Sequence, residues 1–166
     1  MTTPDARPGK PGIITMYDSV TTALLPAGAA RYAAYVNGKF ANHAAVQTRF
    51  PHARVFGIDV LGTAWTQASI LDWEPGDVQA AATLRDWVTR REAWRTHSAT
   101  VYCDRDELDD VEKFLAGVWH QLWVSTLDGT DMTGERTSAG NLIVATQLRG
   151  GLEAPFDTST ALDSWG

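Results

Sequence analysis

The sequence has little of several features that mark large classes of proteins. It holds one cysteine, Cys103, so no disulfide can form within the chain. Its 14 basic residues are outnumbered by 20 acidic ones and form no Lys/Arg-rich run, which argues against a nucleic-acid partner. No stretch approaches the roughly 18 consecutive apolar residues of a membrane-spanning helix. We therefore expect neither nucleic-acid binding nor membrane insertion.

Motifs that bind nucleotides or metals are also missing. Gly38 and Gly62 stand alone and Gly150-Gly151 comes late, so there is no glycine-rich phosphate loop. This makes a nucleotide- or phosphate-binding α/β domain the weakest interpretation. The four histidines have no metal-ligand spacing; they are His43, His52, His97 and His120. We expect no metal and no cofactor.

The first twelve residues are polar and rich in proline and glycine. They predict a flexible arm over residues 1–12, ahead of a single domain over residues 13–166. They lack the apolar core of a secretion signal. We expect synthesis in the cytoplasm, and action at a cell wall only if another factor exports or releases the protein.

The whole sequence is 44% hydrophobic, and after residue 12 strand-like segments alternate with helical ones. A strand–helix alternation favours a parallel sheet built from βα units. About 200 residues is the usual lower limit of a (β/α)8 barrel, so we predict a shortened TIM-type barrel with several short or missing helices. The predicted strands cover residues 13–18, 33–38, 54–61, 70–74, 99–103, 121–126 and 142–148.

Other segments are predicted more coarsely. Asp77 opens the clearest helix, and Arg90, Arg91 and Arg95 near its end suit the helix dipole as solvated residues. Residues 130–140 are polar and predict a mobile loop. Residues 156–159 predict a turn.

The stretch Ile70–Asp77 holds the most informative pattern. In a strand, Asp72 and Glu74 lie on one face, and Trp73 lies on the other. Pro75-Gly76 ends the strand, so both acids fall at its carboxyl end, where α/β folds place their sites. Two carboxylates held close together push each other's pKa values apart, so that one can donate a proton while the other stays ionised. A glycoside hydrolase needs such a pair of acids. The alternative is an exposed acid pair in a loop, with Asp77 as a helix N-cap.

The order of several short motifs resembles glycoside hydrolase family 25, the barrel-fold lysozymes. The resemblance is closer to the shorter glycoside-hydrolase-like domains of actinobacteria and their phages. It implies a barrel that cleaves the β-1,4 bond between N-acetylmuramic acid and N-acetylglucosamine in peptidoglycan, without metal or cofactor. The motifs are Tyr17-Asp18-Ser19, Leu71-Asp72-Trp73-Glu74, Val101-Tyr102, Leu122-Trp123-Val124, Val144-Ala145-Thr146-Gln147 and Phe156-Asp157-Thr158-Ser159.

The resemblance implies roles for four acids. Glu74 matches the general acid, Asp72 its paired carboxylate, and Asp18 and Asp157 two further acids around the cleft. Glu74 would protonate the glycosidic oxygen. Asp72 or Asp157 would stabilise the oxocarbenium ion, or the substrate's own N-acetyl oxygen would attack the anomeric carbon.

The remaining matched positions allow two interpretations each. Tyr102, Trp123 and Gln147 fall where family members carry cleft-facing residues, and each suits core packing equally well. Asp59 is an additional acid that either joins the cluster and contacts substrate or forms a turn.

The sequence also departs from the family pattern. Thr146 replaces a characteristic Trp, and Ser125-Thr126-Leu127 replaces an Ala-Xaa-Tyr motif. Phe56–Val60 stands where full-length members carry a Lys and a Glu-Gly. A second hypothesis therefore remains open: a catalytically silent domain that binds cell-wall glycan or serves as a structural or interaction module.

Overall fold

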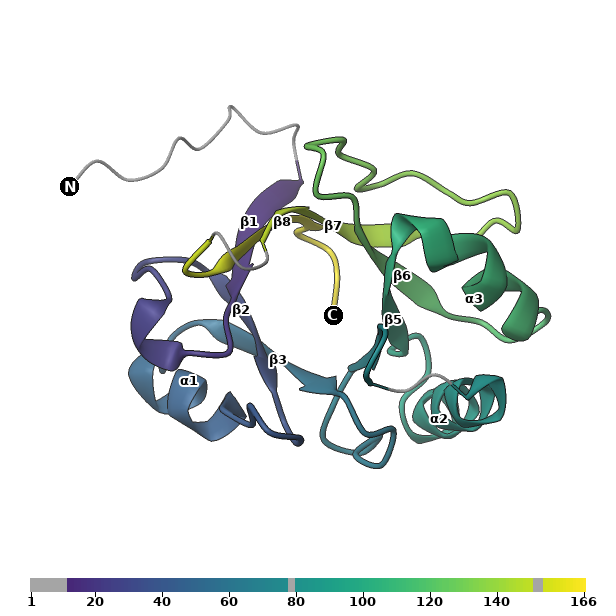
Figure 1. Cartoon of the computed structure of the whole chain (residues 1–166), viewed down its shortest axis with the longest axis horizontal. Helices are drawn as coiled ribbons and strands as arrows, with labels where there is room; N and C mark the ends of the chain where they lie inside the picture. The colour runs from purple at the N-terminus through teal and green to yellow at the C-terminus, as the bar shows by residue number, and fades with distance from the viewer. Residues whose placement is uncertain (1–11, 78–79, 151–153) are drawn as a thin grey trace.

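A closed barrel of eight strands, in chain order, forms the centre of the molecule (Figure 1). The computed structural model describes residues 12–77, 80–150 and 154–166. The shortened TIM-type barrel predicted from the sequence is confirmed. The strands are β1 (Ile13–Asp18), β2 (Arg31–Tyr35), β3 (Arg54–Asp59), β4 (Ile70–Trp73), β5 (Thr100–Asp104), β6 (Gln121–Ser125), β7 (Ile143–Arg149) and β8 (Asp157–Leu162).

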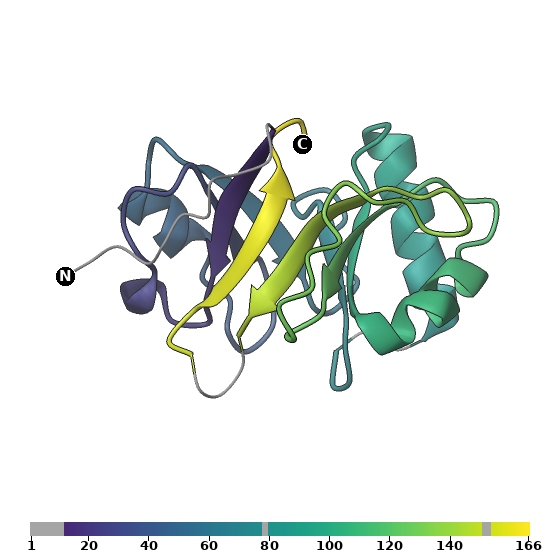
Figure 2. The ribbon, with the colours of Figure 1, turned by 90° about the horizontal axis from the view of Figure 1, so that it is seen from above.

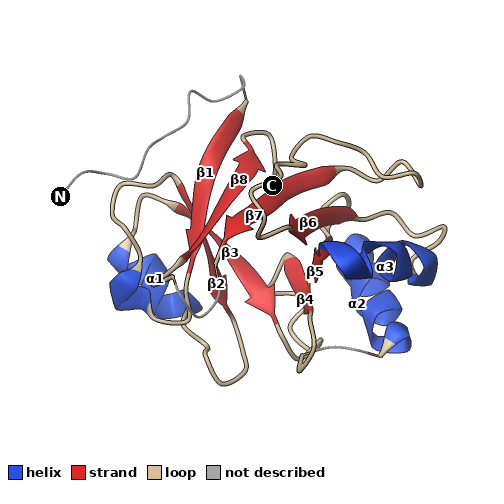
Figure 3. Cartoon of the chain, turned by 45° about the horizontal axis from the view of Figure 1, so that its top comes forward, coloured by secondary structure: helices blue, strands red, loops and turns tan. Residues whose placement is uncertain are grey.

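Few helices surround this barrel, which explains how it fits into 166 residues. Helix α1 packs against β2 and β3, whereas α2 and α3 pack against each other and against β4 and β5 respectively. Figure 3 shows the helices at two sides of the barrel and none over β7 and β8. The helices are α1 (His43–Arg49), α2 (Ala81–Trp94) and α3 (Leu108–Phe114), with 3-10 turns η1 (Thr22–Leu24) and η2 (Arg105–Glu107).

The last strand corrects two predictions. Residues 156–159 were expected to form a turn in an all-parallel sheet, but strand β8 begins at Asp157 and runs antiparallel to both β1 and β7. Figure 2 shows β8 beside β1, pointing the opposite way. The connection from β7 is too short for a helical crossover, so the chain returns in the opposite direction. Strand β8 therefore begins at the barrel end where β1 to β7 finish.

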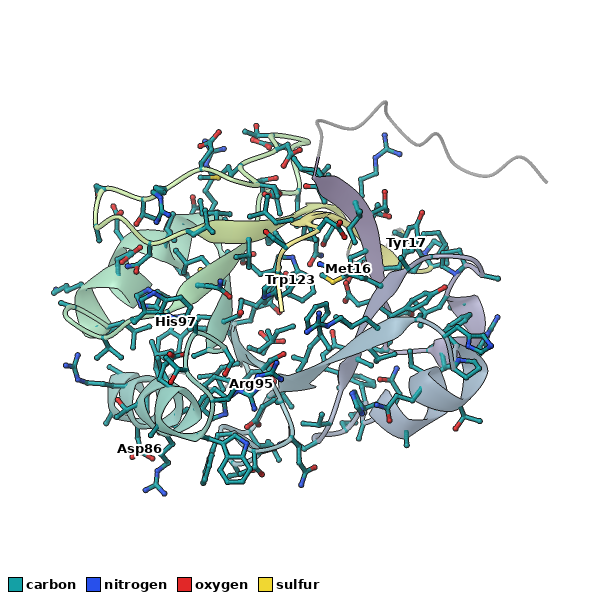
Figure 4. All side chains as sticks on the ribbon, turned by 180° about the vertical axis from the view of Figure 1, so that it is seen from behind. Met16, Tyr17, Asp86, Arg95, His97 and Trp123 are labelled. Carbon is teal, nitrogen blue, oxygen red and sulfur yellow. The ribbon has the colours of Figure 1, made fainter. Side chains whose placement is uncertain are left out.

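Side-chain alternation separates the barrel interior from its outer surface. Met16 and Trp123 belong to the interior core, whereas Tyr17 packs outside against Phe156 (Figure 4). Trp73 also faces outward, as predicted, and meets the ring of Phe114 on helix α3 at 6.0 Å. Alternate side chains of a strand thus belong to two apolar layers, one inside the barrel and one between the barrel and its helices.

Helix α2 begins later than predicted. The predicted start, Asp77, lies in a turn whose backbone N–H donates to the carbonyl of Glu74 at 3.0 Å. The helix starts at Ala81, after residues 78–79, which lie outside the described part of the chain. Its N-cap, Ala80, has no capping side chain, so burial of Leu84, Trp87 and neighbouring apolar residues stabilises it instead.

The predicted loop over residues 130–140 is tied to the end of the barrel by hydrogen bonds. Gly134 N–H donates to the carbonyl of Ile143 at 2.8 Å, and Arg136 forms an isolated bridge with Leu142. Of the predicted N-terminal arm, residues 1–11 lie outside the described residues. None of the described helices combines the length and apolarity that a membrane span requires.

Candidate active site

A cavity of about 210 Å³ opens at the carboxyl ends of the parallel strands. Five acids line it: Asp18, Asp72, Glu74, Asp104 and Asp157. They come from β1, β4, the turn after β4, β5 and β8. The four acids that the sequence predicted for the site are therefore brought together in the fold, although 139 positions separate the first from the last.

Strand register explains how these side chains meet. Asp18 and Asp157 are directly opposed partners in the antiparallel β1–β8 pair, so their side chains lie next to each other on the interior face. Asp72 lies level with Tyr102, and Tyr102 lies level with Trp123, across β4, β5 and β6. The registers thus bring two groups of side chains to one barrel end: a pair of acids, and a row of one acid with two aromatic residues.

Asp72 and Glu74 form a second close pair of acids. One carboxylate oxygen of each lies within 4.8 Å of the other, and an oxygen of Asp77 lies within the same distance of both. Three oxygens so close could hold a hard cation such as Ca²⁺ or Mg²⁺. A cation here would have to displace protons, because both Asp72 and Glu74 have raised pKa values.

Burial and mutual repulsion keep protons on the two deepest acids. Asp18 is 2% exposed and Asp72 is 4% exposed. Burial, followed by the charge of Asp157, raises the pKa of Asp18 well above its usual range. A hydrogen bond joins these two carboxyl groups, which requires a proton on one of them. Burial, followed by the charge of Glu74, raises the pKa of Asp72 in the same way.

Glu74 differs from these two acids because it is only partly buried, at the cavity wall. Burial, and then the charge of Asp104, raise its pKa to about 7, although a hydrogen bond from Tyr102 lowers it. A carboxylic acid with this pKa holds its proton near neutral pH and can still release it. This is the property that a general acid needs.

The remaining predicted residues line the same cavity. Tyr102, Trp123 and Gln147 all contribute to its wall. Trp123 is 2% exposed, donates its indole N–H to Ser159 Oγ at 3.2 Å, and meets the Tyr102 ring edge-on at 4.8 Å. Trp123 thus serves core packing as well as the cavity wall, which joins the two interpretations that the sequence allowed.

Asp59 is a correction, because it does not line this cavity. Its side chain is fully buried beside the loop after β3. Its carboxylate accepts hydrogen bonds from the backbone N–H groups of Leu61 and Gly62 at 3.0 and 2.8 Å. It also accepts from the side chains of Asn37 and Trp87, both at 2.8 Å. Asp59 therefore holds this loop and helix α2 in place, as the turn-forming alternative predicted.

Sequence reasoning missed five residues of the cavity wall, of which Ile58 is the apolar one from strand β3. Asp104 lies at the N-cap position of η2, but its side chain makes no capping hydrogen bond and lines the cavity instead. It follows Tyr102 by two residues in the same strand, so alternation could have placed it. Tyr35, Ser125 and Leu127 also line the cavity. Tyr35 has a raised pKa, first through burial and then through Asp18, and stays a neutral phenol.

Gly150 leaves room for two side chains of the cavity wall, Asp157 and Gln147. A Cβ atom built on Gly150 would overlap Asp157 Oδ1 and lie 2.5 Å from Gln147 Nε2. Both polar side chains therefore approach the backbone at a point where only glycine leaves room. The sequence signal, a glycine shortly after a strand, was too general to reveal this contact.

Comparisons with known proteins agree on the fold. No family model and no curated protein matches the sequence. A muramidase structure from Trichobolus zukalii is similar, with a TM-score of 0.54 and 12% identity, over 88% of this chain and 92% of that one. The catalytic domain of endolysin ply40, from bacteriophage P40 of Listeria monocytogenes, has a TM-score of 0.50 and 13% identity, over 92% and 95%.

A muramidase structure from Acremonium alcalophilum is also similar, with a TM-score of 0.51 and 12% identity, over 90% of this chain and 93% of that one. Because nearly the whole of each chain is covered, the likeness extends to the complete barrel and not to a shared motif. The chain has the barrel fold of muramidases and of an endolysin catalytic domain.

Proposed function

We propose that this chain is a muramidase-type glycoside hydrolase that cleaves the β-1,4 bond between N-acetylmuramic acid and N-acetylglucosamine in peptidoglycan. The observation that carries the proposal is Glu74, an acid with a pKa of about 7, within 4.8 Å of Asp72 in an acid-lined cavity. The similar fold of muramidases and of an endolysin domain supports the choice of substrate.

In the proposed reaction, Glu74 gives its proton to the glycosidic oxygen. The bond between this oxygen and the anomeric carbon breaks, and its electron pair stays on the leaving oxygen. The positive charge that develops on the sugar ring faces the Asp18–Asp157 pair, in which Asp157 can stay ionised while Asp18 holds the proton. Asp72, whose pKa is raised, can contribute negative charge only after it has lost its proton. Water then adds to the anomeric carbon and returns a proton to Glu74.

The spacing of the acids favours retention of the anomeric configuration. Inverting enzymes separate their two carboxyl groups by about 6.5–9.5 Å to admit a water molecule. The Asp72 and Glu74 oxygens lie within 4.8 Å, which leaves no such room between them. Asp72 or the substrate's N-acetyl oxygen would then attack the anomeric carbon. Proton NMR of the first product formed would distinguish retention from inversion.

A catalytically silent glycan-binding domain is the second candidate, and one observation favours it. The cavity has a thin aromatic wall, because Trp123 is 2% exposed and Leu127, 54% exposed, occupies the mouth. Sugar rings bind well to exposed aromatic faces, and few such faces line this cavity.

Clearing of purified cell walls separates the two candidates. We expect the wild-type protein to reduce turbidity and Glu74→Gln to lose this activity while keeping its fold, because an amide cannot supply the proton. Glu135→Gln is the matched control, since Glu135 is exposed on the loop of residues 130–140. Binding without clearing by the wild type would support the silent domain. Equal clearing by wild type and Glu74→Gln would refute the assignment of the general acid.

A further inference from the structure

A second cavity, of about 230 Å³, opens near the amino ends of β3, β4 and β6, at the end of the barrel opposite the acids. Its wall includes Arg54 at the start of β3 and two arginines, Arg91 and Arg95, from the end of helix α2. His97 and Trp165 also line this cavity. Figure 4 shows Arg95 on the side of α2 nearer the barrel, with Asp86 on the outer side.

The three arginines of this cavity have few negative partners: Gly166, the last residue of the sequence, lines the wall beside Arg54, and the charge of Glu92 acts on Arg91. Aspartate and glutamate side chains are absent from its wall as far as the chain is described, and none of its three arginines forms a salt bridge there. The nearby Glu92 carboxylate accepts hydrogen bonds from the backbone N–H groups of residues 97, 98 and 99. Three guanidinium groups thus share one cavity in a protein of net charge −6.

Arg91 gives the second, independent indication of a ligand. It is 6% exposed, and its Nε atom has no hydrogen-bond partner in the described structure. Its Nη1 group donates to the carbonyl of Trp65 at 3.0 Å, which fixes the guanidinium plane. Burial, followed by the charge of Arg95, lowers the pKa of Arg91. A buried donor without a partner is costly, and an anion beside it would remove this cost.

Two exposed aromatic rings lie outside the cavity wall but contact residues close to it. Trp94, next to Arg95 in the chain, is 62% exposed, and its ring meets Trp65 edge-on at 6.0 Å. Trp119 is 38% exposed and meets the His97 ring at 4.5 Å. Exposed flat apolar faces beside guanidinium groups are suited to a ligand that combines a sugar ring with a negative charge.

We propose that this arginine cavity, formed by Arg54, Arg91 and Arg95, binds a phosphate or carboxylate group carried on a glycan. The guanidinium groups bind the anion through paired N–H donors, and Trp94 or Trp119 packs against the attached sugar. The site is separate from the acid cavity, so it does not depend on the proposed hydrolysis.

Calorimetric titration with three sugars tests the proposal: glucose 6-phosphate, glucuronate and glucose. We expect both anionic sugars to bind more tightly than glucose, and the tighter of the two identifies the preferred anion. The double variant Arg54→Gln/Arg95→Gln should weaken binding about tenfold or more, because each charged hydrogen bond contributes substantially. Both side chains are exposed, so this variant should fold. Trp94→Ala and Trp119→Ala are measured separately, with inorganic phosphate as an additional ligand. At least one of them should weaken binding of glucose 6-phosphate and leave binding of inorganic phosphate unchanged, and no loss in either would overturn the sugar contact.

The matched control is Arg90→Gln, on the same helix but outside the cavity, where Arg90 pairs with Asp86 at 2.7 Å. It should bind within about twofold of wild type, since surface ion pairs of this kind contribute little. Equal losses in Arg90→Gln and in the double variant would overturn the proposal, because they would indicate unspecific attraction. Binding of glucose as tight as that of glucose 6-phosphate would also overturn it. Glu74→Gln should bind these sugars as tightly as wild type. The binding result is therefore independent of whether the protein is a hydrolase.

Discussion

The two ends of the barrel gather ionisable groups of opposite kinds, and burial shifts their pKa values in opposite directions. At the carboxyl end, burial and crowding raise the pKa values of Asp18, Asp72 and Glu74, so the acids take up protons. At the amino end, the arginines cannot lose their protons near neutral pH, so they keep their positive charge. Glu74 at the carboxyl end can therefore donate a proton near neutral pH, whereas the arginines at the amino end stay positively charged.

The barrel interior keeps these two ends apart. Met16, Trp123 and Trp165 belong to a continuous apolar core between the cavities. The Trp165 ring stacks on Phe56 at 4.4 Å and meets Trp123 edge-on at 6.4 Å. Because this layer excludes water, each end titrates within its own surroundings. We therefore expect substitutions at the acid end to change the pH dependence of activity and stability, and substitutions at the arginine end to leave it unchanged.

The largest effect beyond the loss of Glu74 itself is expected from Gly150→Ala. The new methyl group would displace Asp157 and Gln147, because its Cβ would lie 2.5 Å from Gln147 Nε2 and overlap Asp157 Oδ1. Displacements of about 1 Å at a site can reduce rates on the order of 100-fold. Initial rates of cell-wall clearing would measure this loss.

Gly140→Ala provides the control for Gly150→Ala. Gly140 has a φ of +89° and no atom within 4 Å of an added Cβ, so this variant strains the backbone far from the cavity. It should lower stability by about 1 kcal/mol and leave the clearing rate unchanged. Equal rates for Gly150→Ala and wild type would show that the position of Asp157 does not matter.

A smaller effect is expected when Asp104 becomes Asn. The charge of Asp104 is the second cause, after burial, of the raised pKa of Glu74. Glu74 acts in its protonated form, so activity should fall as pH rises through about 7 in the wild type. Removing the Asp104 charge lowers this pKa, so activity should fall at a lower pH. A pH profile of kcat/KM that does not move would exclude Asp104 as a neighbour of the titrating acid.

The smallest effect concerns stability. The folded-state pKa of Asp72 is raised, so its contribution to stability is greatest at low pH and is lost as pH rises through that value. Asp72→Asn removes this pH-dependent cost. We expect its Tm to exceed that of wild type at pH 8 and the difference to shrink towards pH 4. A gain of 1 kcal/mol corresponds to roughly 2–4 °C for a domain of this size.

Thermal melts at several pH values would measure this difference, with Asp106→Asn, an exposed acid, as the control. A difference that is constant with pH would indicate that Asp72 is ionised throughout. Arginine does not titrate in this range, so no comparable pH dependence is expected from the amino end.

The alternation of residues along a single strand predicted which side chains face the barrel interior and which face outward. Asp72 and Glu74 lie towards the cavity and Trp73 lies outward because successive residues of a strand face opposite ways. The direction of β8 could not be predicted in this way, because strand direction depends on pairing with β1 and β7.

Long-range partners account for the other differences. Asp59 accepts a hydrogen bond from Trp87, which lies 28 residues further along the chain in helix α2. No local sequence pattern predicts a contact between residues so far apart. Arg91 was expected to be a solvated helix residue, but the packing of α2 against the barrel leaves it 6% exposed. The cavities themselves arise from the register of eight strands, which is a property of the closed barrel and not of any one segment.

The most direct test of the account is an NMR titration of the Glu74 side-chain carboxyl carbon in ¹³C-labelled protein, assigned with Glu74→Gln. We expect its midpoint near pH 7, because burial and Asp104 hold the proton on this group. A midpoint near the ordinary glutamate value of about 4.3 would contradict the account, since Glu74 would then be ionised at neutral pH and could not act as the general acid.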